Sequence, residues 1–392
     1  MHHQAFAAPR ELHVPQSYDV VACERCGFVY ADQATPQHEI DRDYEAHSKY
    51  AANVAEPAAT HAAFPTDAPW DASRLDGVAT YLADRLPASL RVLDAGCSSG
   101  TFLRYLKEKG FDDVVGLDPS HEAVASAIQH NGVRAFAGSF TTPPPDLGTF
   151  DVVTLSHTLE HIADVRSAIG SLEALLKPAG IAYIEVPDAE RYDSYLVAPF
   201  HDFNTEHINH FSLGVLRTLM RNAGFEEIDS AAKIVYCSER DEYPAIFGLW
   251  RKVQRPTNSA DNIHRDEALV AAARRYVDAS RRRMSRIDKA LRADLGDRDD
   301  VILWGAGQLS MKLLRDTVLA TKRIAAIVDS SPQRHGMHVG STEIVAPTAL
   351  RELPPFPIVI TSIHSDEAIA QTIERRMALP HQAIRLYRAA PN

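Results

Sequence analysis

From Arg91 onward the chain alternates short apolar runs with amphipathic stretches, and this alternation constrains the fold more than any other feature. The apolar runs are bounded by Gly, Pro or Asp, as buried strands are; they are VLDAGC, VVGLDP, FDVVTLS and IAYIEVP. The stretches between them have helical spacing; they are TFLRYLKEKG, HEAVASAIQHNG and VRSAIGSLEALLKPAG. The pattern predicts an α/β fold whose mainly parallel sheet binds ligands at the carboxyl ends of its strands.

The carboxy-terminal part repeats this alternation after a long helix. From about Asn262 to Leu295, apolar or small residues recur at steps of three and four, which predicts an amphipathic helix. These positions are Leu269, Ala273, Tyr276, Ser280, Met284, Ile287, Leu291 and Leu295. The segments DVILWGAGQLSMKLL, IAAIVDSS and PIVITS follow. We therefore expect an amino-terminal segment 1–60, an α/β domain 61–240, a helical linker 241–298 and a second α/β domain 299–392.

Composition excludes several classes of protein. The 392 residues carry 41 basic and 52 acidic side chains, a net charge of −11, which disfavours binding to nucleic acid. No run of about 18 apolar residues is present to span a membrane, and the first residues do not have the pattern of a signal peptide. With only four cysteines, a disulfide framework is not expected. We expect a cytoplasmic protein, and the sequence does not predict its oligomeric state.

A glycine-rich turn follows the first of these apolar runs. In RVLDAGCSSGTFLRYLKEKG, Asp94, Gly96 and Gly100 stand where a strand turns into a helix. Glycine lets the backbone approach a ligand closely, although a tight structural turn has the same appearance. The next strand ends at Asp118, where a carboxylate can accept both hydroxyls of a ribose. A third strand is expected to end near Ser139 and Phe140, where an adenine could lie against the ring.

These segments resemble a known family. DAGCSSG resembles motif I of the class I S-adenosylmethionine-dependent methyltransferases, and FDVVTLSHTLEHI and LLKPAGIAYIEVPD resemble its later motifs, over about residues 75 to 230. The resemblance implies a Rossmann-like sheet. It also implies that S-adenosylmethionine lies against the cofactor residues Asp94, Gly96, Ser98, Gly100, Asp118, Ser139, Phe140 and Ser156. Ser98 replaces the middle glycine of the motif. For Glu160 and His161 we expect a structural or pocket role rather than catalysis.

A histidine-rich segment offers the acid–base candidate. Methyl transfer is an in-line displacement, so the protein orients the acceptor and removes its proton. HDFNTEHINHFS brings His201, Glu206, His207 and His210 into one short segment, and a carboxylate can orient an imidazole. The alternative is a polar loop in which Ser212 caps the next helix.

The segment also resembles a narrower group, the bacterial sugar C-methyltransferases and related sugar methyltransferases. In that group an EH pair before an aromatic residue and a serine supplies the catalytic histidine, which corresponds to Glu206 and His207. The group's tyrosine is absent, and Asn204 stands in its place as the third catalytic candidate, so transfer to oxygen is favoured at least as much as transfer to carbon. The resemblance implies a sugar or nucleotide-sugar acceptor, with His210 among its contacts.

The amino-terminal cysteines Cys23 and Cys26 form one CxxC pair. YDVVACERCGFVYAD resembles half of the zinc element of the same group, but tetrahedral zinc needs four ligands and the second pair is missing. We therefore do not expect zinc. Instead we expect a degenerate knuckle that has kept its fold and lost its metal. By the same resemblance, Tyr50 closes over the cofactor.

A second glycine-rich turn lies in ILWGAGQLSMKLL, with Gly305, Gly307 and, after the next strand, Asp329. It resembles a dinucleotide fingerprint in which Ser310 replaces the third glycine. Three interpretations remain: binding of NAD, binding of the nucleotide of a nucleotide-sugar, or an empty Rossmann-like domain. Sugar methyltransferases of the group above carry such a domain to hold substrate. The rival functions are an NAD-dependent oxidoreductase and a non-catalytic nucleotide-binding protein.

Overall fold

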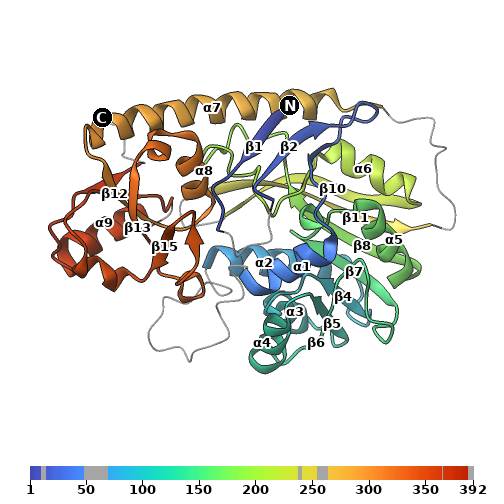
Figure 1. The fold of residues 1–392 in the computed structure, drawn as a ribbon. Helices are drawn as coiled ribbons and strands as arrows, with labels where there is room; N and C mark the ends of the chain where they lie inside the picture. The colour runs from blue at the N-terminus through green and yellow to red at the C-terminus, as the bar shows by residue number, and fades with distance from the viewer. Residues whose placement is uncertain (10–14, 48–68, 237–240, 254–263, 364, 387–392) are drawn as a thin grey trace. The chain divides into compact units, whose positions relative to one another are not determined.

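The computed structural model describes residues 1–9, 15–47, 69–236, 241–253, 264–363 and 365–386, and Figure 1 shows its ribbon. The chain divides into two compact units. Unit 1 comprises Met1–Val20, Leu196–Asn204 and Arg274–Asn392, and unit 2 comprises Val21–Tyr195 and Thr205–Ala273. Among the helices that the structure describes, none is both long enough and apolar enough to cross a membrane.

Unit 2 is built on a seven-stranded sheet in the order β10-β11-β8-β7-β4-β5-β6. Its strands are β4 Val92–Ala95, β5 Val114–Asp118, β6 Arg134–Ala137, β7 Phe150–Ser156, β8 Leu176–Pro187, β10 Phe225–Tyr236 and β11 Glu242–Lys252. Only β11 runs antiparallel to its neighbours in this sheet. The predicted parallel α/β sheet is confirmed.

Helices cover both faces of this sheet (Figure 1). Residues of α2, α3 and α4 share a buried cluster with Val92 and Val152, whereas residues of α5 and α6 share another with Leu93 and Val153. Successive strand residues point to opposite faces, so the two clusters lie on opposite sides. The helices are α1 Gln37–His47, α2 Pro69–Ala83, α3 Thr101–Glu108, α4 His121–Asn131, α5 Val165–Leu175 and α6 Leu213–Asn222. A short pair, β3 Val29–Asp32 and β9 Asn209–His210, also belongs to this unit.

One predicted helix is shorter than expected. The sequence predicts a helix through Gly180, but α5 ends at Leu175 and β8 begins at Leu176. Pro178 has no backbone N–H and would clash with the preceding turn of a helix. Ala179 adopts a positive φ of 60°, which a continuing helix would not allow. The proline therefore ends the helix before the segment KPAG.

The predicted boundary of the linker at residue 241 is wrong. Residues Glu242–Lys252 form β11, which pairs with β8 and β10 inside the seven-stranded sheet. A strand with neighbours on both sides and helices on both faces is apolar on both faces, so it lacks the alternation that identifies half-buried strands. The first α/β unit therefore continues past residue 240.

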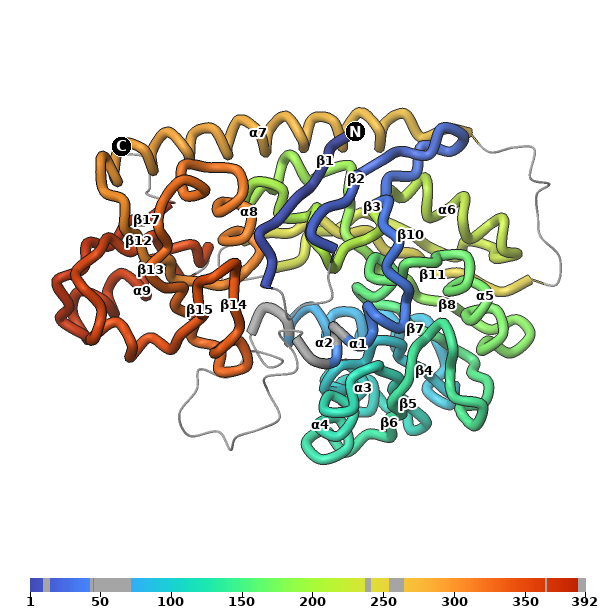
Figure 2. Tube along the Cα trace, viewed as in Figure 1, coloured from blue at the N-terminus to red at the C-terminus, as the bar shows by residue number. Residues whose placement is uncertain are grey.

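Unit 1 contains a six-stranded sheet in the order β14-β15-β13-β12-β16-β17. Its strands are β12 Asp300–Trp304, β13 Arg323–Val328, β14 His338–Val339, β15 Thr342–Val345, β16 Ile358–Ile360 and β17 Ala383–Arg385. The pair β14–β15 is antiparallel and lies at one edge (Figure 2), while the other pairs are parallel. The helical segments are α8 Gln308–Asp316, α9 Asp366–Gln371 and the turns Val318–Thr321, Pro332–Arg334, Pro347–Glu352 and Thr372–Arg376. The predicted second α/β fold is confirmed.

The long helix α7 runs from Glu267 to Leu295, and β1 His2–Ala5 pairs with β2 Ser17–Ala22. All of the positions predicted for the apolar face of α7 are buried, from Leu269 to Leu295. The interleaved arginines are mostly exposed. The spacing of three and four residues therefore identified the buried face correctly.

We expect Ser212→Ala to lower the free energy of unfolding by about 1 kcal/mol, the usual cost of losing an N-cap. The Ser212 hydroxyl accepts a hydrogen bond from Val215 N (2.9 Å) at the start of α6, and it donates to Asp266 Oδ2 (2.5 Å). Urea denaturation followed by circular dichroism measures the change. Ser212→Asn, which still caps a helix, is the control and should recover most of the stability. An unchanged midpoint in Ser212→Ala would contradict the capping role.

Candidate active site

The turn after β4 is held in left-handed backbone conformations. Gly96, Ser98 and Gly100 have φ values of 81°, 48° and 80°. A Cβ on Gly96 would collide with the side chain of Thr158, whose hydroxyl donates to Ala95 O (2.9 Å). The backbone at Gly96 therefore packs directly against the segment that follows β7, and only glycine fits there.

Two buried carboxylates stand at the carboxyl ends of adjacent strands. Asp118 Oδ2 accepts from Ser98 N (2.8 Å) and Oδ1 from Ser120 N (2.9 Å), while Asp94 Oδ1 accepts from Thr154 Oγ1 (2.7 Å). Burial raises the pKa of Asp118 to about 6 and that of Asp94 to about 7, because desolvation penalises the charged form. The structure thus brings these two predicted cofactor residues to the same turn.

The other predicted cofactor residues in the described structure also follow strands of this sheet. Ser139 and Phe140 come after β6; Phe140 is buried in the core, and Ser139 Oγ lies 3.1 Å from Thr141 Oγ1. Ser156 ends β7, and its hydroxyl accepts from Arg74 Nη1 (2.9 Å). Tyr50 lies outside the described residues.

A buried ionic network that the sequence analysis did not identify centres on Glu185, near the end of β8. Its carboxylate lies 3.4 Å from Arg74 Nη1 and 3.3 Å from His157 Nε2, and it accepts from Tyr183 OH (2.6 Å) and from Lys233 Nζ. Burial alone would raise the pKa of Glu185. The hydrogen bond from His157 and the charges of Lys233 and Arg74 instead hold that pKa well below its ordinary value.

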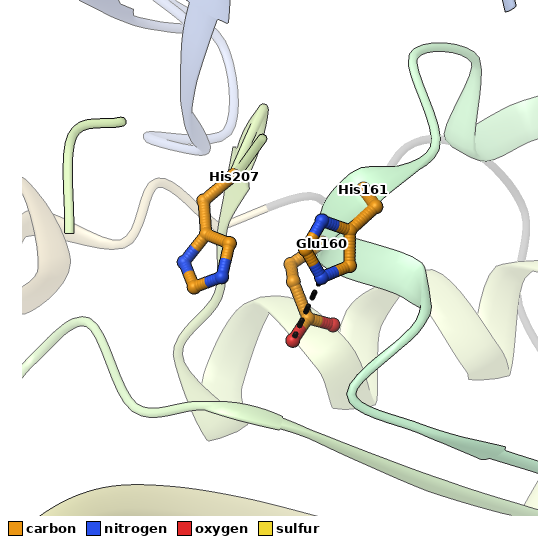
Figure 3. Close-up of side chains that lie close together, drawn as sticks. All are labelled: Glu160, His161 and His207. Carbon is orange, nitrogen blue, oxygen red and sulfur yellow. Dashed lines mark ion pairs between the residues drawn. The ribbon is translucent and has the colours of Figure 1, made fainter. Parts of the chain in front are cut away.

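Glu160, His161 and His207, from the segments that follow β7 and precede β9, form a cluster (Figure 3). Their ligand atoms all lie within 4.8 Å of one another, and the rings of His161 and His207 meet edge to face at 4.9 Å between centroids. Glu160 is fully buried, and its Oε1 lies 3.2 Å from His157 Nδ1. Burial lowers the pKa of His157, but hydrogen bonds to Glu160 and Glu185 outweigh it and raise the pKa above its ordinary value.

The carboxylate grouped with His207 in this cluster is Glu160; the role of Glu206 as the orienting carboxylate stays a prediction. Glu206 reaches the cluster through its backbone carbonyl, which accepts from His161 Nδ1 (3.0 Å). The segment LEH had drawn attention to Glu160 and His161 in the sequence. Glu206 was expected to orient His207 only because the two residues are adjacent in the sequence. Asn204, the third predicted catalytic residue, belongs to unit 1, where its side chain donates to His201 O (3.1 Å).

His210, predicted to contact substrate, lies in the interior on β9. Its side chain is fully buried and meets the ring of Tyr192 edge to face. Burial lowers its pKa to about 3, so the ring is neutral. This burial argues against the predicted substrate contact, because no face of the ring is open to a ligand.

Cys23 and Cys26 lie in the turn between β2 and β3, where Gly27 N donates to Cys23 O (2.9 Å) and Cys23 N to Phe28 O (2.8 Å). Within the described ranges, Glu160, His161 and His207 form a group of three with metal-ligand spacing, and these cysteines belong to no such group. His13 and Cys237 are outside those ranges. The structure therefore gives the CxxC pair no further ligand in the part of the chain that it describes.

The second glycine turn, in unit 1, is held in the same way as the first. Asp329 Oδ2 accepts from Ala306 N (2.7 Å) and Oδ1 from Ser331 N (2.9 Å). A Cβ on Gly305, at φ 116°, would lie 2.7 Å from Thr361 Oγ1. Gly307 precedes α8 as its N-cap.

Asp94→Asn should stabilise the protein at alkaline pH. Below about pH 3.8 both folded and unfolded Asp94 are protonated; above it the unfolded side chain ionises while the folded one keeps its proton up to about pH 7. The unfolded state then binds fewer protons, so the wild type loses stability across this window, by up to a few kcal/mol. Asn cannot ionise and still accepts from Thr154.

Urea denaturation from pH 4 to pH 8 measures this effect. We expect the variant to be more stable than the wild type at pH 8 and the difference to shrink toward pH 4. Parallel stability profiles of the two proteins would contradict the raised pKa.

Residues 70–230 match the family model described as "Methyltransferase domain". The chain is 25% identical over 332 residues to the C-methyltransferase NovU of Streptomyces niveus, a match that covers 81% of this chain and 73% of NovU. It is 32% identical over 115 residues to a ubiquinone biosynthesis O-methyltransferase of Colwellia psychrerythraea, covering 28% of this chain and 46% of that protein. The chain thus spans less than half the length of this second relative.

Among solved structures, magnesium protoporphyrin IX methyltransferase from Synechocystis PCC 6803 is 17% identical with a TM-score of 0.43; the match covers 55% of this chain and 100% of that chain. The domain match and the long match to NovU agree with the glycine turn and its two carboxylates. The chain therefore contains a class I S-adenosylmethionine-dependent methyltransferase domain over residues 70–230.

Proposed function

We propose that this methyltransferase transfers a methyl group to an oxygen or a carbon atom of a nucleotide-linked sugar, with His207 as the general base. The match to NovU, a C-methyltransferase by name, covers far more of the chain than the methyltransferase domain does, and it supports this proposal. The observation that carries the proposal is the cluster in which His207 lies within 4.8 Å of the buried Glu160 carboxylate.

The cofactor lies over the turn after β4 in this proposal. Asp118 binds the ribose hydroxyls, since each of its oxygens accepts a single hydrogen bond from the backbone and has a second lone pair available. Asp94 and Gly96 border the methionine part, Phe140 and Ser139 border the adenine, and Ser98, Gly100 and Ser156 complete the pocket. S-adenosylmethionine supplies the activated methyl group and the leaving group.

His207 accepts the proton of the acceptor as the methyl group is transferred. The reaction places a positive charge on the imidazole, and a buried carboxylate stabilises that charge strongly because little water screens it. Glu160 supplies this carboxylate. The segment that holds it is anchored to the cofactor turn, because Thr158 packs against Gly96.

Unit 1 holds the nucleotide part of the acceptor in this proposal, at Gly305, Gly307 and Asp329. The support is the likeness of this turn to the cofactor turn: in each, an aspartate after the second strand accepts from a backbone N–H of the glycine turn. Calorimetric titrations with S-adenosylhomocysteine and with NAD distinguish the proposed methyltransferase from an NAD-dependent oxidoreductase. Tight binding of NAD without binding of S-adenosylhomocysteine would contradict the proposal. Incubation with S-adenosylmethionine and single nucleotide-sugars, followed by mass spectrometry, identifies the acceptor.

Asp118→Ala should weaken the binding of S-adenosylhomocysteine by about 1.5–3 kcal/mol, the range for hydrogen bonds to a charged group. Isothermal calorimetry measures the change. Asp112→Ala, which removes an exposed carboxylate shortly before β5, is the matched control and should bind as the wild type does. Equal affinities in the two variants, with normal circular dichroism, would place the cofactor elsewhere.

His207→Asn should reduce turnover on the order of 10²–10⁴-fold, the usual contribution of a positioned base, without weakening S-adenosylhomocysteine binding. His130→Asn, at an exposed position of α4, is the control and should keep full turnover. Deuterium exchange at the acceptor carbon without the methyl donor distinguishes the routes, because only transfer to carbon requires prior loss of that proton. Nearly full turnover in His207→Asn at saturating acceptor would refute the base assignment.

A further inference from the structure

The cluster of Glu160, His161 and His207 has the donor set of a metal site. Glu160 and His161 lie in the short helix η2 Leu159–His161, and His207 comes from the segment before β9 (Figure 3). One carboxylate and two imidazoles place their ligand atoms within 4.8 Å of one another. This spacing is short enough for all three to reach one ion with small side-chain movements, since metal–ligand bonds are about 2.0–2.2 Å long.

Hydrogen bonds fasten these two segments together. Ile208 N donates to Glu160 O (2.8 Å), and Asn209 Nδ2 donates to Ile162 O (2.6 Å) and Leu159 O (3.3 Å). Asn209 is itself buried. The backbone on both sides of the cluster is thus fixed before any ligand arrives, which lowers the cost of assembling a binding site.

The Glu160 carboxylate has an unused acceptor inside the protein. The residue is fully buried, and its Oε2 accepts no hydrogen bond from any residue that the structure describes. A buried carboxylate oxygen without a donor costs free energy. A cation bound beside Glu160 would provide the missing partner. Its Oε1, beside His157 Nδ1, is oriented by that neighbour.

His161 presents the correct nitrogen. A carbonyl can only accept, so the contact of His161 Nδ1 with Glu206 O requires the proton to be on Nδ1. The lone pair of the neutral ring is then on Nε2, which lies 4.0 Å from Glu160 Oε1, the oxygen beside His157. Metal-binding histidines commonly have this arrangement, with the second ring nitrogen bonded to a carbonyl.

We propose that Glu160, His161 and His207 bind one divalent transition-metal ion of the zinc class. Imidazole with carboxylate favours Zn²⁺ and its first-row neighbours over Mg²⁺ and Ca²⁺, which prefer oxygen ligands alone. Three protein ligands leave a coordination position open for water.

The proposal predicts inhibition, and this part rests on the proposed function. A neutral imidazole has one lone pair, so the nitrogen of His207 that binds the ion cannot also accept the proton of the acceptor. The ion and the acceptor's proton therefore compete for His207.

Metal binding is measured on the full chain after removal of metal with a chelator. Co²⁺ serves as the probe, because its visible absorption reports coordination, and Zn²⁺ displaces it in competition. We expect one equivalent of Co²⁺ to bind, and each of Glu160→Gln, His161→Asn and His207→Asn to weaken its binding at least about tenfold. Calorimetry with S-adenosylhomocysteine checks that each variant keeps its fold.

Controls exclude the other metal ligands of the chain. The double variants His2→Ala/His3→Ala and Cys23→Ser/Cys26→Ser should bind Co²⁺ as the wild type does, and the complex should lack the near-ultraviolet band of cobalt–thiolate bonds. Absence of Co²⁺ binding by the wild type would overturn the proposal. Binding that is lost with the cysteines and kept in Glu160→Gln would overturn it as well.

Turnover separates this inference from the proposed function. If both are correct, the metal-free enzyme is active and Zn²⁺ inhibits it in proportion to occupancy of the site. Turnover that requires the ion would overturn both the competition and the role of His207 as base. Unimpaired turnover of metal-free His207→Asn would overturn the base alone, because the Co²⁺ titration tests the site without reference to activity.

Discussion

The site depends on the clamp that Asp118 places on the cofactor turn. Its two oxygens accept from Ser98 N, in the turn after β4, and from Ser120 N, at the start of α4. One side chain at the end of β5 therefore fixes a strand, a turn and a helix relative to each other. The clamp requires burial of the carboxylate, and the raised pKa of Asp118 is the electrostatic consequence. Unit 1 repeats the arrangement with Asp329.

Close packing connects the turn after β4 to the cluster of Glu160, His161 and His207. Gly96 leaves no room for a side chain because Thr158 occupies the space, and Thr158 in turn bonds to Ala95 O. Glu160 and His161, two members of the cluster, follow two and three residues after Thr158. A larger residue at Gly96 would therefore displace both the turn after β4 and Thr158, which stands two residues before Glu160.

The sequence predicted those parts of the fold that depend on local periodicity. The apolar face of α7 and the strands around Asp94 and Asp118 were identified because three- to four-residue spacing and buried runs are visible within a short window. β11 was missed because a strand buried on both faces has no alternation. The partners of Glu185 were missed for a different reason: Arg74 and Lys233 lie 111 and 48 residues away in the sequence. Their meeting is a property of the tertiary fold, which brings Arg74 of α2 and Lys233 of β10 to the same carboxylate.

The same limit explains why Glu206, not Glu160, was expected to pair with His207. Glu206 is adjacent to His207 in the sequence, and its backbone carbonyl accepts from His161 Nδ1. Glu160 comes from a separate turn after β7. His157 lies between the two carboxylates: its Nδ1 is 3.2 Å from Glu160 Oε1 and its Nε2 is 3.3 Å from Glu185, and Lys233 and Arg74 offset the charge of Glu185. Buried charges are costly unless they are compensated, and the chain of contacts from Glu160 through His157 to Glu185 extends this compensated polar core to the end of β8.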